Sequence, residues 1–99
     1  MPTVQQVILN LISGIDDTEV RMEIARTLMY LSYVYASGRA DEREVAQSVY
    51  EVVETVVKMK HPELDPDERR RIAKQLAEEV MDAFRAQAIM RRVAARFGA

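Results

Sequence analysis

One histidine and no cysteine limit the chemistry that this 99-residue chain could perform. Without cysteine there is no disulfide, no thiolate nucleophile and no cysteine-based metal site. The histidine, His61, stands beside Pro62 at a predicted helix end, where we expect its imidazole to interact with exposed carbonyl groups. A di-iron helical bundle needs a Glu-x-x-His motif on each of two helices, which one histidine does not supply. These residues therefore predict neither a catalytic site nor a metal centre.

Acidic residues are the other candidates for chemistry, and four of them cluster between residues 63 and 68. A calcium-binding EF-hand would require a twelve-residue loop with glycine at its sixth position, which this segment lacks. Asp65 and Glu68 have the spacing of a helix capping box, which accounts for both without a metal. Two more pairs stand at helical spacing, Glu51 with Glu54 and Glu78 with Asp82. Such pairs are typical of solvated helix faces. All three glycines lie at predicted helix ends, so the sequence contains no glycine-rich phosphate-binding loop. We therefore expect no enzymatic activity, no metal and no cofactor.

The C-terminal part of the chain is basic, because Ala83 to Ala99 contains four arginines and no acidic residue. The four are Arg85, Arg91, Arg92 and Arg96. In one interpretation they form a solvated face paired with Glu78 and Asp82. In the other they form a strip that binds phosphate groups, which makes a nucleic-acid-associated accessory protein the alternative function. The net charge of -2 provides no strong attraction to nucleic acid, so this alternative ranks second.

The segment Thr27–Gly38 holds twelve residues without a charge, including three of the four tyrosines. In a helix, steps of about 100° per residue place a second uncharged stripe opposite the primary apolar stripe. One interpretation is that this helix is central in the monomer and covered on both sides. We favour an interface instead, because exposed tyrosine and methionine patches mark partner sites, and a second copy is the commonest partner. The predicted partner-binding residues are Met22, Met29, Tyr30 and Tyr33.

Capping signals divide the chain into four helices, at about residues 2–13, 17–37, 42–60 and 66–97. Four residue pairs have capping-box spacing: Thr3 with Gln6, Asp16 with Glu19, Asp41 with Glu44, and Asp65 with Glu68. Gly14 and Gly38 are expected to end the first two helices in the left-handed conformation. Pro62 prevents continuation of the third helix, and Pro66 suits the first position of the fourth.

Each predicted helix has one apolar face that should point into the core. In the second helix this face is Val20, Ile24, Leu28, Leu31 and Tyr35. In the third helix it is Val45, Val49, Val52, Val56 and Met59. In the fourth helix the inward residues are Ile72, Leu76, Val80, Ala83, Phe84, Gln87, Met90 and Ala94, with Ile89 among the arginines of the far side.

Short links of about two to five residues predict antiparallel neighbours, hence an all-α bundle of four helices forming a single domain, residues 1–99. The first helix is short, about 17 Å, and the last is long, about 45 Å. This mismatch would leave part of the second and fourth helices uncovered. The predicted function is therefore a non-enzymatic interaction or assembly protein, homodimeric through the tyrosine-rich face of the second helix and the long fourth helix, with a second protein partner as a further expectation.

The composition, 48% hydrophobic and 30% charged, is typical of a folded domain. The uncharged segment around Tyr30 is much shorter than the roughly 20 residues of a membrane-spanning helix, so we expect no membrane association. The N-terminal residues MPTVQQ lack the basic start and apolar run of a signal peptide, which favours a cytoplasmic protein. Eleven of the fourteen basic residues are arginine and only one asparagine is present, a composition that would suit a heat-loving source.

Overall fold

Side-chain caps set the helix starts in the structure, a computed structural model that describes residues 2–98. Within that range the chain forms α1 (Val4–Ile12), α2 (Thr18–Ser37), α3 (Glu42–Lys60) and α4 (Pro66–Arg96), and no strand. The Thr3 hydroxyl accepts a hydrogen bond from the backbone N–H of Gln6, and the Gln6 amide oxygen accepts one from Thr3, at 3.1 and 2.8 Å. Asp41 and Asp65 cap α3 and α4 with their carboxylates. The predicted N-caps Thr3, Asp41 and Asp65 are confirmed, and among these three helices the structure shows the reciprocal capping box only at α1.

The predicted cap of α2 is wrong by one residue, because the N-cap is Asp17 and not Asp16. The Asp17 carboxylate accepts a hydrogen bond from the backbone N–H of Val20 at 3.2 Å. The Arg21 guanidinium donates to the carbonyl oxygen of Asp16, which holds that residue outside the helix. At its other end α2 stops at Gly38, whose φ of 73° is a left-handed conformation with no steric cost for glycine.

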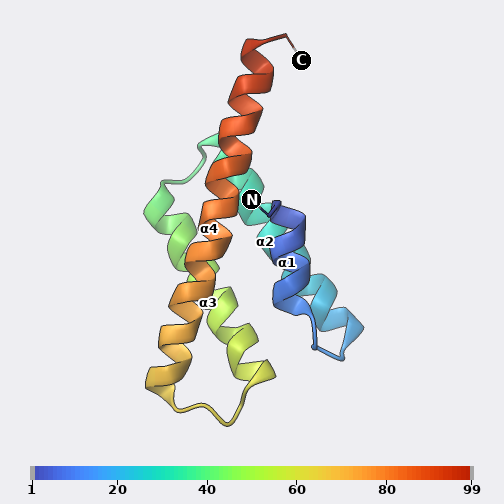
Figure 1. Cartoon of the computed structure of the whole chain (residues 1–99), viewed down its shortest axis with the longest axis vertical. Helices are drawn as coiled ribbons and strands as arrows, with labels where there is room; N and C mark the ends of the chain where they lie inside the picture. The colour runs from blue at the N-terminus through green and yellow to red at the C-terminus, as the bar shows by residue number, and fades with distance from the viewer. Residues whose placement is uncertain (1, 99) are drawn as a thin grey trace.

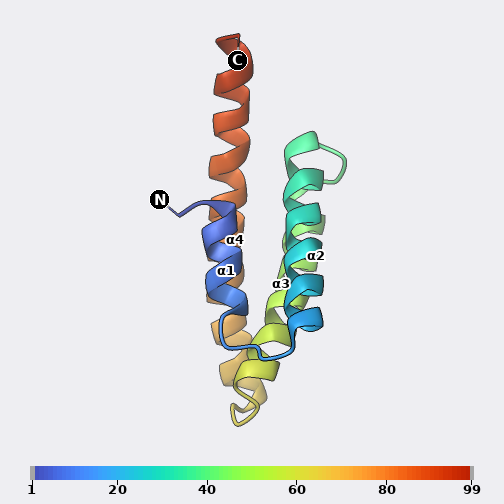
Figure 2. The ribbon, with the colours of Figure 1, turned by 90° about the vertical axis from the view of Figure 1, so that its right-hand side faces the viewer.

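The four helices pack as an up-and-down bundle (Figure 1). The 31-residue α4 runs along the whole molecule, whereas α1 has nine residues. Each helix contacts the next one in the chain, and α1 closes the bundle by packing against α4. Figure 2 shows α2 and α4 on opposite sides of the bundle. The predicted fold class, with a short first and a long last helix, is confirmed.

The core is rich in valine, and the buried face of α3 differs in part from the predicted one. Val52 and Met59 were expected on the inner face of α3, but Val52 is only half-buried and Met59 is 44% exposed. Val53 and Val57 are buried in their place. Val45, Val49 and Val56 are buried as predicted, so the buried face of α3 is rotated towards Val53 and Val57 relative to the predicted face. In α2, by contrast, the predicted stripe is buried or half-buried throughout.

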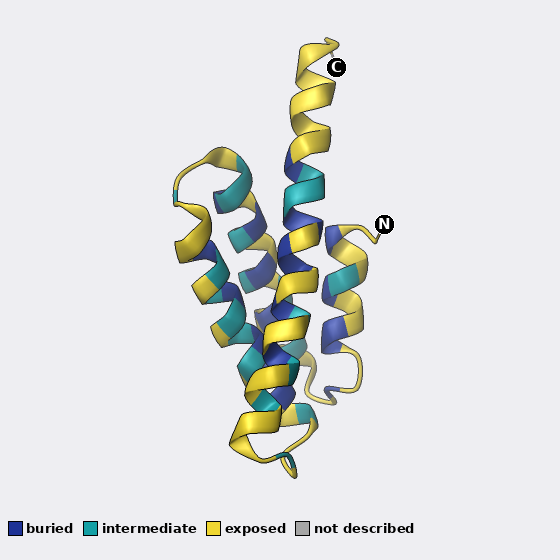
Figure 3. Ribbon diagram, turned by 60° about the vertical axis from the view of Figure 1, so that its left-hand side comes forward, coloured by how far each residue is buried: buried dark blue, intermediate teal, exposed yellow. Residues whose placement is uncertain are grey.

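The C-terminal turns of α4 extend beyond the other helices. Figure 3 shows these turns exposed on all sides. Met90 and Ala94 were predicted to face inward, and both predictions are wrong: Met90 is 67% exposed, and Ala94 is exposed as well. The physical reason is that α1, α2 and α3 are too short to reach this part of α4, so burial within the bundle ends at Ala88.

The extension makes the molecule elongated, with principal extents of 50 × 27 × 23 Å. Its radius of gyration is 14.2 Å, whereas a compact domain of this length is expected near about 12.6 Å. A single bundle with one end of α4 uncovered accounts for this difference.

Candidate interaction surfaces

The predicted partner-binding residues of α2 lie together on an uncovered face. Met22, Met29, Tyr30 and Tyr33, which we call the tyrosine face, are 37–63% exposed. Because these four side chains are exposed, the interpretation in which α2 is enclosed on both sides is not supported. The Arg39 guanidinium lies 5.5 Å from the centre of the Tyr33 ring, a cation–π contact at the end of this face.

Arg85 does not belong with the other three arginines of the predicted strip. Its Nε donates to the Glu42 carboxylate at 3.1 Å, and its Nη1 donates to Asp82 at 2.8 Å. The Tyr35 hydroxyl donates to the same Glu42 oxygen at 2.9 Å. The network therefore joins α2, α3 and α4, and it leaves the Arg85 charge neutralised by carboxylates.

The pKa values of this network follow from its hydrogen bonds. The hydrogen bond from Arg85, followed by that from Tyr35, lowers the pKa of Glu42. The hydrogen bond to Glu42 raises the pKa of Arg85. Burial raises the pKa of the Tyr35 hydroxyl, and its hydrogen bond to Glu42 adds to that rise, so the tyrosine stays protonated and remains a donor. Sequence spacing shows only the Asp82–Arg85 pair, because Glu42 and Tyr35 come from other helices.

The remaining arginines lie on the α4 extension, by which we mean residues 89–97. Among the described residues, no carboxylate lies within 4.0 Å of Arg91, Arg92 or Arg96. The extension also carries large apolar side chains that are 45–80% exposed: Ile89, Met90, Val93 and Phe97. A shallow hollow of about 180 Å³ lies between Ile89, Val93 and Phe97, with arginines at its edges. The extension therefore combines apolar and basic character.

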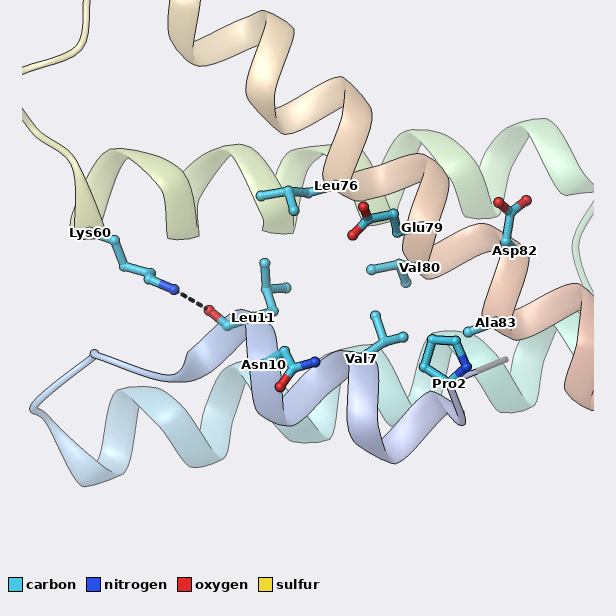
Figure 4. Close-up of a pocket in the computed structure, with 10 residues that line it drawn as sticks. All are labelled: Pro2, Val7, Asn10, Leu11, Lys60, Leu76, Glu79, Val80, Asp82 and Ala83. Carbon is cyan, nitrogen blue, oxygen red and sulfur yellow. Dashed lines mark hydrogen bonds between the residues drawn. The ribbon is translucent and has the colours of Figure 1, made fainter.

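A groove between α1 and α4 was not predicted from the sequence. It consists of two adjoining hollows of about 420 and 530 Å³, which share Pro2 and Ala83 in their linings. Figure 4 shows the first hollow, with an apolar floor and with Glu79 and Asp82 on the α4 side. At its far end the Lys60 ammonium donates to the Leu11 carbonyl oxygen at 3.1 Å. We call the two hollows together the α1–α4 groove.

The histidine and the acidic residues that the sequence offered for chemistry are exposed or interact with neighbouring side chains. In the part of the chain that the structure describes, no group of three or more histidine, cysteine, aspartate or glutamate side chains could hold a metal ion. His61 is exposed, with its Nδ1 3.6 Å from the Glu63 carboxylate. Glu54 lies 4.0 Å from the Arg69 guanidinium, and Glu51 accepts a hydrogen bond from Gln47. No helix formed by residues 2–98 has both the length and the apolar character needed to cross a membrane.

Comparison of the chain with protein-family models, with curated proteins and with solved structures finds no match.

Proposed function

We propose that this chain is a non-enzymatic helical interaction protein that forms a homodimer. The observation that carries the proposal is the α4 extension, whose apolar side chains have no cover in the monomer. Exposed apolar patches edged by polar residues mark protein–protein contacts, and contact with a second copy is the most frequent case. The function would then be assembly through burial of apolar surface.

The amount of exposed surface supports the proposal. The accessible surface of the chain is 6747 Å², whereas a compact monomer of 11.3 kDa is expected to expose about 5,700 Å². The excess is about 1,000 Å², and a standard protein–protein interface buries about 800 Å² on each partner. Covering the excess in a dimer would therefore bring the exposed area per chain close to that of a compact protein.

The tyrosine face of α2 is a second surface with the character of an interface. Figure 2 shows α2 and α4 on opposite sides of the bundle, and the tyrosine face and the α4 extension are both exposed. The sequence pattern alone predicted one two-fold interface that includes both surfaces. Because the two helices lie on opposite sides of the bundle, we propose that the two surfaces bind different partners. The α4 side is proposed for self-association, and the tyrosine face for a second protein partner, because tyrosine and methionine are enriched at such contacts.

Light scattering on a sizing column tests the proposal over a tenfold concentration range at low and high salt. The expected result is a molar mass of twice the 11.3 kDa chain mass. Val93→Glu should shift the protein to monomer at unchanged helicity, because it places a charge on the α4 extension. Tyr33→Glu and Lys74→Glu serve as controls that add the same group elsewhere and should leave the dimer intact. A monomeric parent protein at every concentration would overturn the proposal.

A nucleic-acid-associated accessory role is the second candidate. The observation in its favour is that Arg91, Arg92 and Arg96 are exposed and have no carboxylate partner in the described part of the chain. Three phosphate contacts would give an affinity that falls with salt at a slope of about -2.7 on logarithmic axes for duplex DNA. Titration of the protein with duplex and single-stranded probes at low salt tests this role, and a flat titration would exclude it.

A further inference from the structure

We propose that the α4 extension of a second copy lies antiparallel to α4 in the α1–α4 groove, and that a two-fold axis makes this contact reciprocal. The inference rests on the proposed homodimer and assigns its interface. It commits the groove to one occupant, residues 89–97 of an identical chain.

The outer face of α4 has the spacing of a helix–helix seam. Its residues follow one another at three- and four-residue steps: Glu79, Asp82, Ala86, Ile89, Val93 and Phe97. The seam is acidic at its first two positions and apolar from Ala86 onward. The apolar half is uncovered in the monomer, and the acidic half lies along the α1–α4 groove.

The groove is long enough for the extension. Along α4 its lining runs from Leu76 to Met90, a distance of about 21 Å at the helical rise per residue. The apolar part of the extension, from Ile89 to Phe97, is about 12 Å long. The groove is also continuous with the extension, because Ile89 and Met90 line its second hollow. A partner helix beside residues 82–90 would therefore cover the lining of the second hollow and the extension at the same time.

Charge selects the antiparallel direction. If the two-fold axis passes between Ile89 and Met90, Arg96 of each chain lies level with Ala83 of the other. That level is one residue from Asp82 and about 6 Å along the helix from Glu79. The basic end of each α4 then meets the acidic side of the partner's groove. A parallel pair would instead place the arginines of the two extensions side by side, where like charges repel. Lys60 is at the far end of the groove, where it is bound to the Leu11 carbonyl.

Disulfide trapping tests this geometry. The chain contains no cysteine, so only the introduced cysteines can form a disulfide. Ile89→Cys lies next to the proposed axis and should form a disulfide-linked dimer under mild oxidation. Phe97→Cys should not form one alone, because the two copies of residue 97 would be about 22 Å apart along the helix axis and a disulfide spans at most about 7 Å between Cα atoms. A mixture of Phe97→Cys with Asp82→Cys should again be trapped, since these positions face each other.

A charge exchange gives an independent readout in the full chain. Arg96→Glu should weaken dimerisation about two- to fivefold, the size expected for a solvent-exposed ion pair, and the double variant with Glu79→Arg should restore it. Lys74→Glu makes the same change of charge away from the groove and should have no effect.

The outcomes separate this inference from the homodimer proposal. Trapping of Phe97→Cys alone would show a parallel pair and overturn the inference. A dimeric protein in which neither Ile89→Cys nor the mixed pair is trapped would place the interface elsewhere, so the inference fails and the homodimer stands. A protein that is monomeric at every concentration would overturn both.

Discussion

Arg85 joins more elements of this fold than its position in the sequence suggests. It lies on α4, its partner Glu42 begins α3, and Tyr35 lies near the end of α2. The Tyr35 ring also packs near Phe84, with 6.4 Å between ring centres. The network therefore fixes the ends of α2 and α3 against α4 just below the extension.

Glu42 should give the stability of the protein a pH dependence. Its pKa is lowered in the folded state, so the unfolded chain takes up this proton at a higher pH than the folded chain does. The stabilisation is complete above the ordinary value of 4.5 and is lost as the pH falls through the folded-state pKa. We expect Glu42→Gln to lower the free energy of unfolding at neutral pH, and we expect the difference from the parent to shrink below pH 4.5.

Urea denaturation followed by circular dichroism at a series of pH values measures this difference. Glu23→Gln is the matched control, because Glu23 forms an exposed ion pair with Arg26 within one helix and its loss costs only about 0.2–0.5 kcal/mol. The prediction would be contradicted if the difference in free energy of unfolding between Glu42→Gln and the parent stayed constant from pH 7 to below pH 4.5.

Replacement by alanine should affect the free energy of unfolding very differently at the two phenylalanines of the chain. Phe84 is buried in the core and Phe97 is 80% exposed on the α4 extension. Phe84→Ala should lower the free energy of unfolding by about 3–5 kcal/mol, since it leaves a cavity. Phe97→Ala should lower it by less than about 0.5 kcal/mol when measured at low protein concentration, and should weaken the dimer. Similar losses of stability for both variants would mean that residue 97 is part of the monomer core.

At the scale of elements, α1 is the shortest helix and should be the least stable one in isolation. It has nine residues and no basic side chain in its last turn. An isolated helix of this length is marginal in water, so α1 depends on its packing against α2 and α4. Lys60, from the end of α3, supplies a positive charge at the C-terminus of α1, where the helix dipole favours one.

Removal of that charge should weaken the attachment of α1. Lys60→Met is expected to lower the free energy of unfolding by about 1 kcal/mol, because the Leu11 carbonyl loses its donor and the helix end loses a cation. Lys58→Met, an exposed position in the same turn of α3, should change it by less than about 0.5 kcal/mol. Urea denaturation measures both variants, and equal effects would argue against a specific role for Lys60.

At the scale of the whole molecule, the bundle and the α4 extension are separable. The core closes without any residue beyond Ala88, and every residue from Ile89 to Gly98 is exposed. We therefore expect folding of the monomer not to depend on the extension, whereas the proposed dimer requires it.

Truncation after Arg91 should separate the two properties. The shortened chain should keep a cooperative unfolding transition, because the deleted residues contribute nothing to the core, and it should be monomeric by light scattering. Full-length Phe97→Ala is the control for a change at the same surface without loss of helix. An unfolded truncation product would show that the last turns of α4 are needed for the fold.

The sequence by itself determined the helices and their order. Caps act over three residues and apolar periodicity over a few turns, so both are local and visible in a single chain. The short links then imposed antiparallel neighbours, and the unequal helix lengths indicated that part of α4 would be uncovered. The choice of Asp16 over Asp17 failed because both residues have capping side chains, and the contact that decides between them comes from Arg21.

Only the tertiary structure decided which surfaces form and which residues share them. Arg85 binds Glu42 across 43 positions of sequence, and Lys60 binds Leu11 across 49, so no local pattern could show either contact. The α1–α4 groove exists because the first helix packs against the last helix, which is far away in the sequence. The periodicity of α2 allowed either an enclosed helix or an open face. In the structure α2 packs against α1, α3 and α4, and its tyrosine face stays exposed.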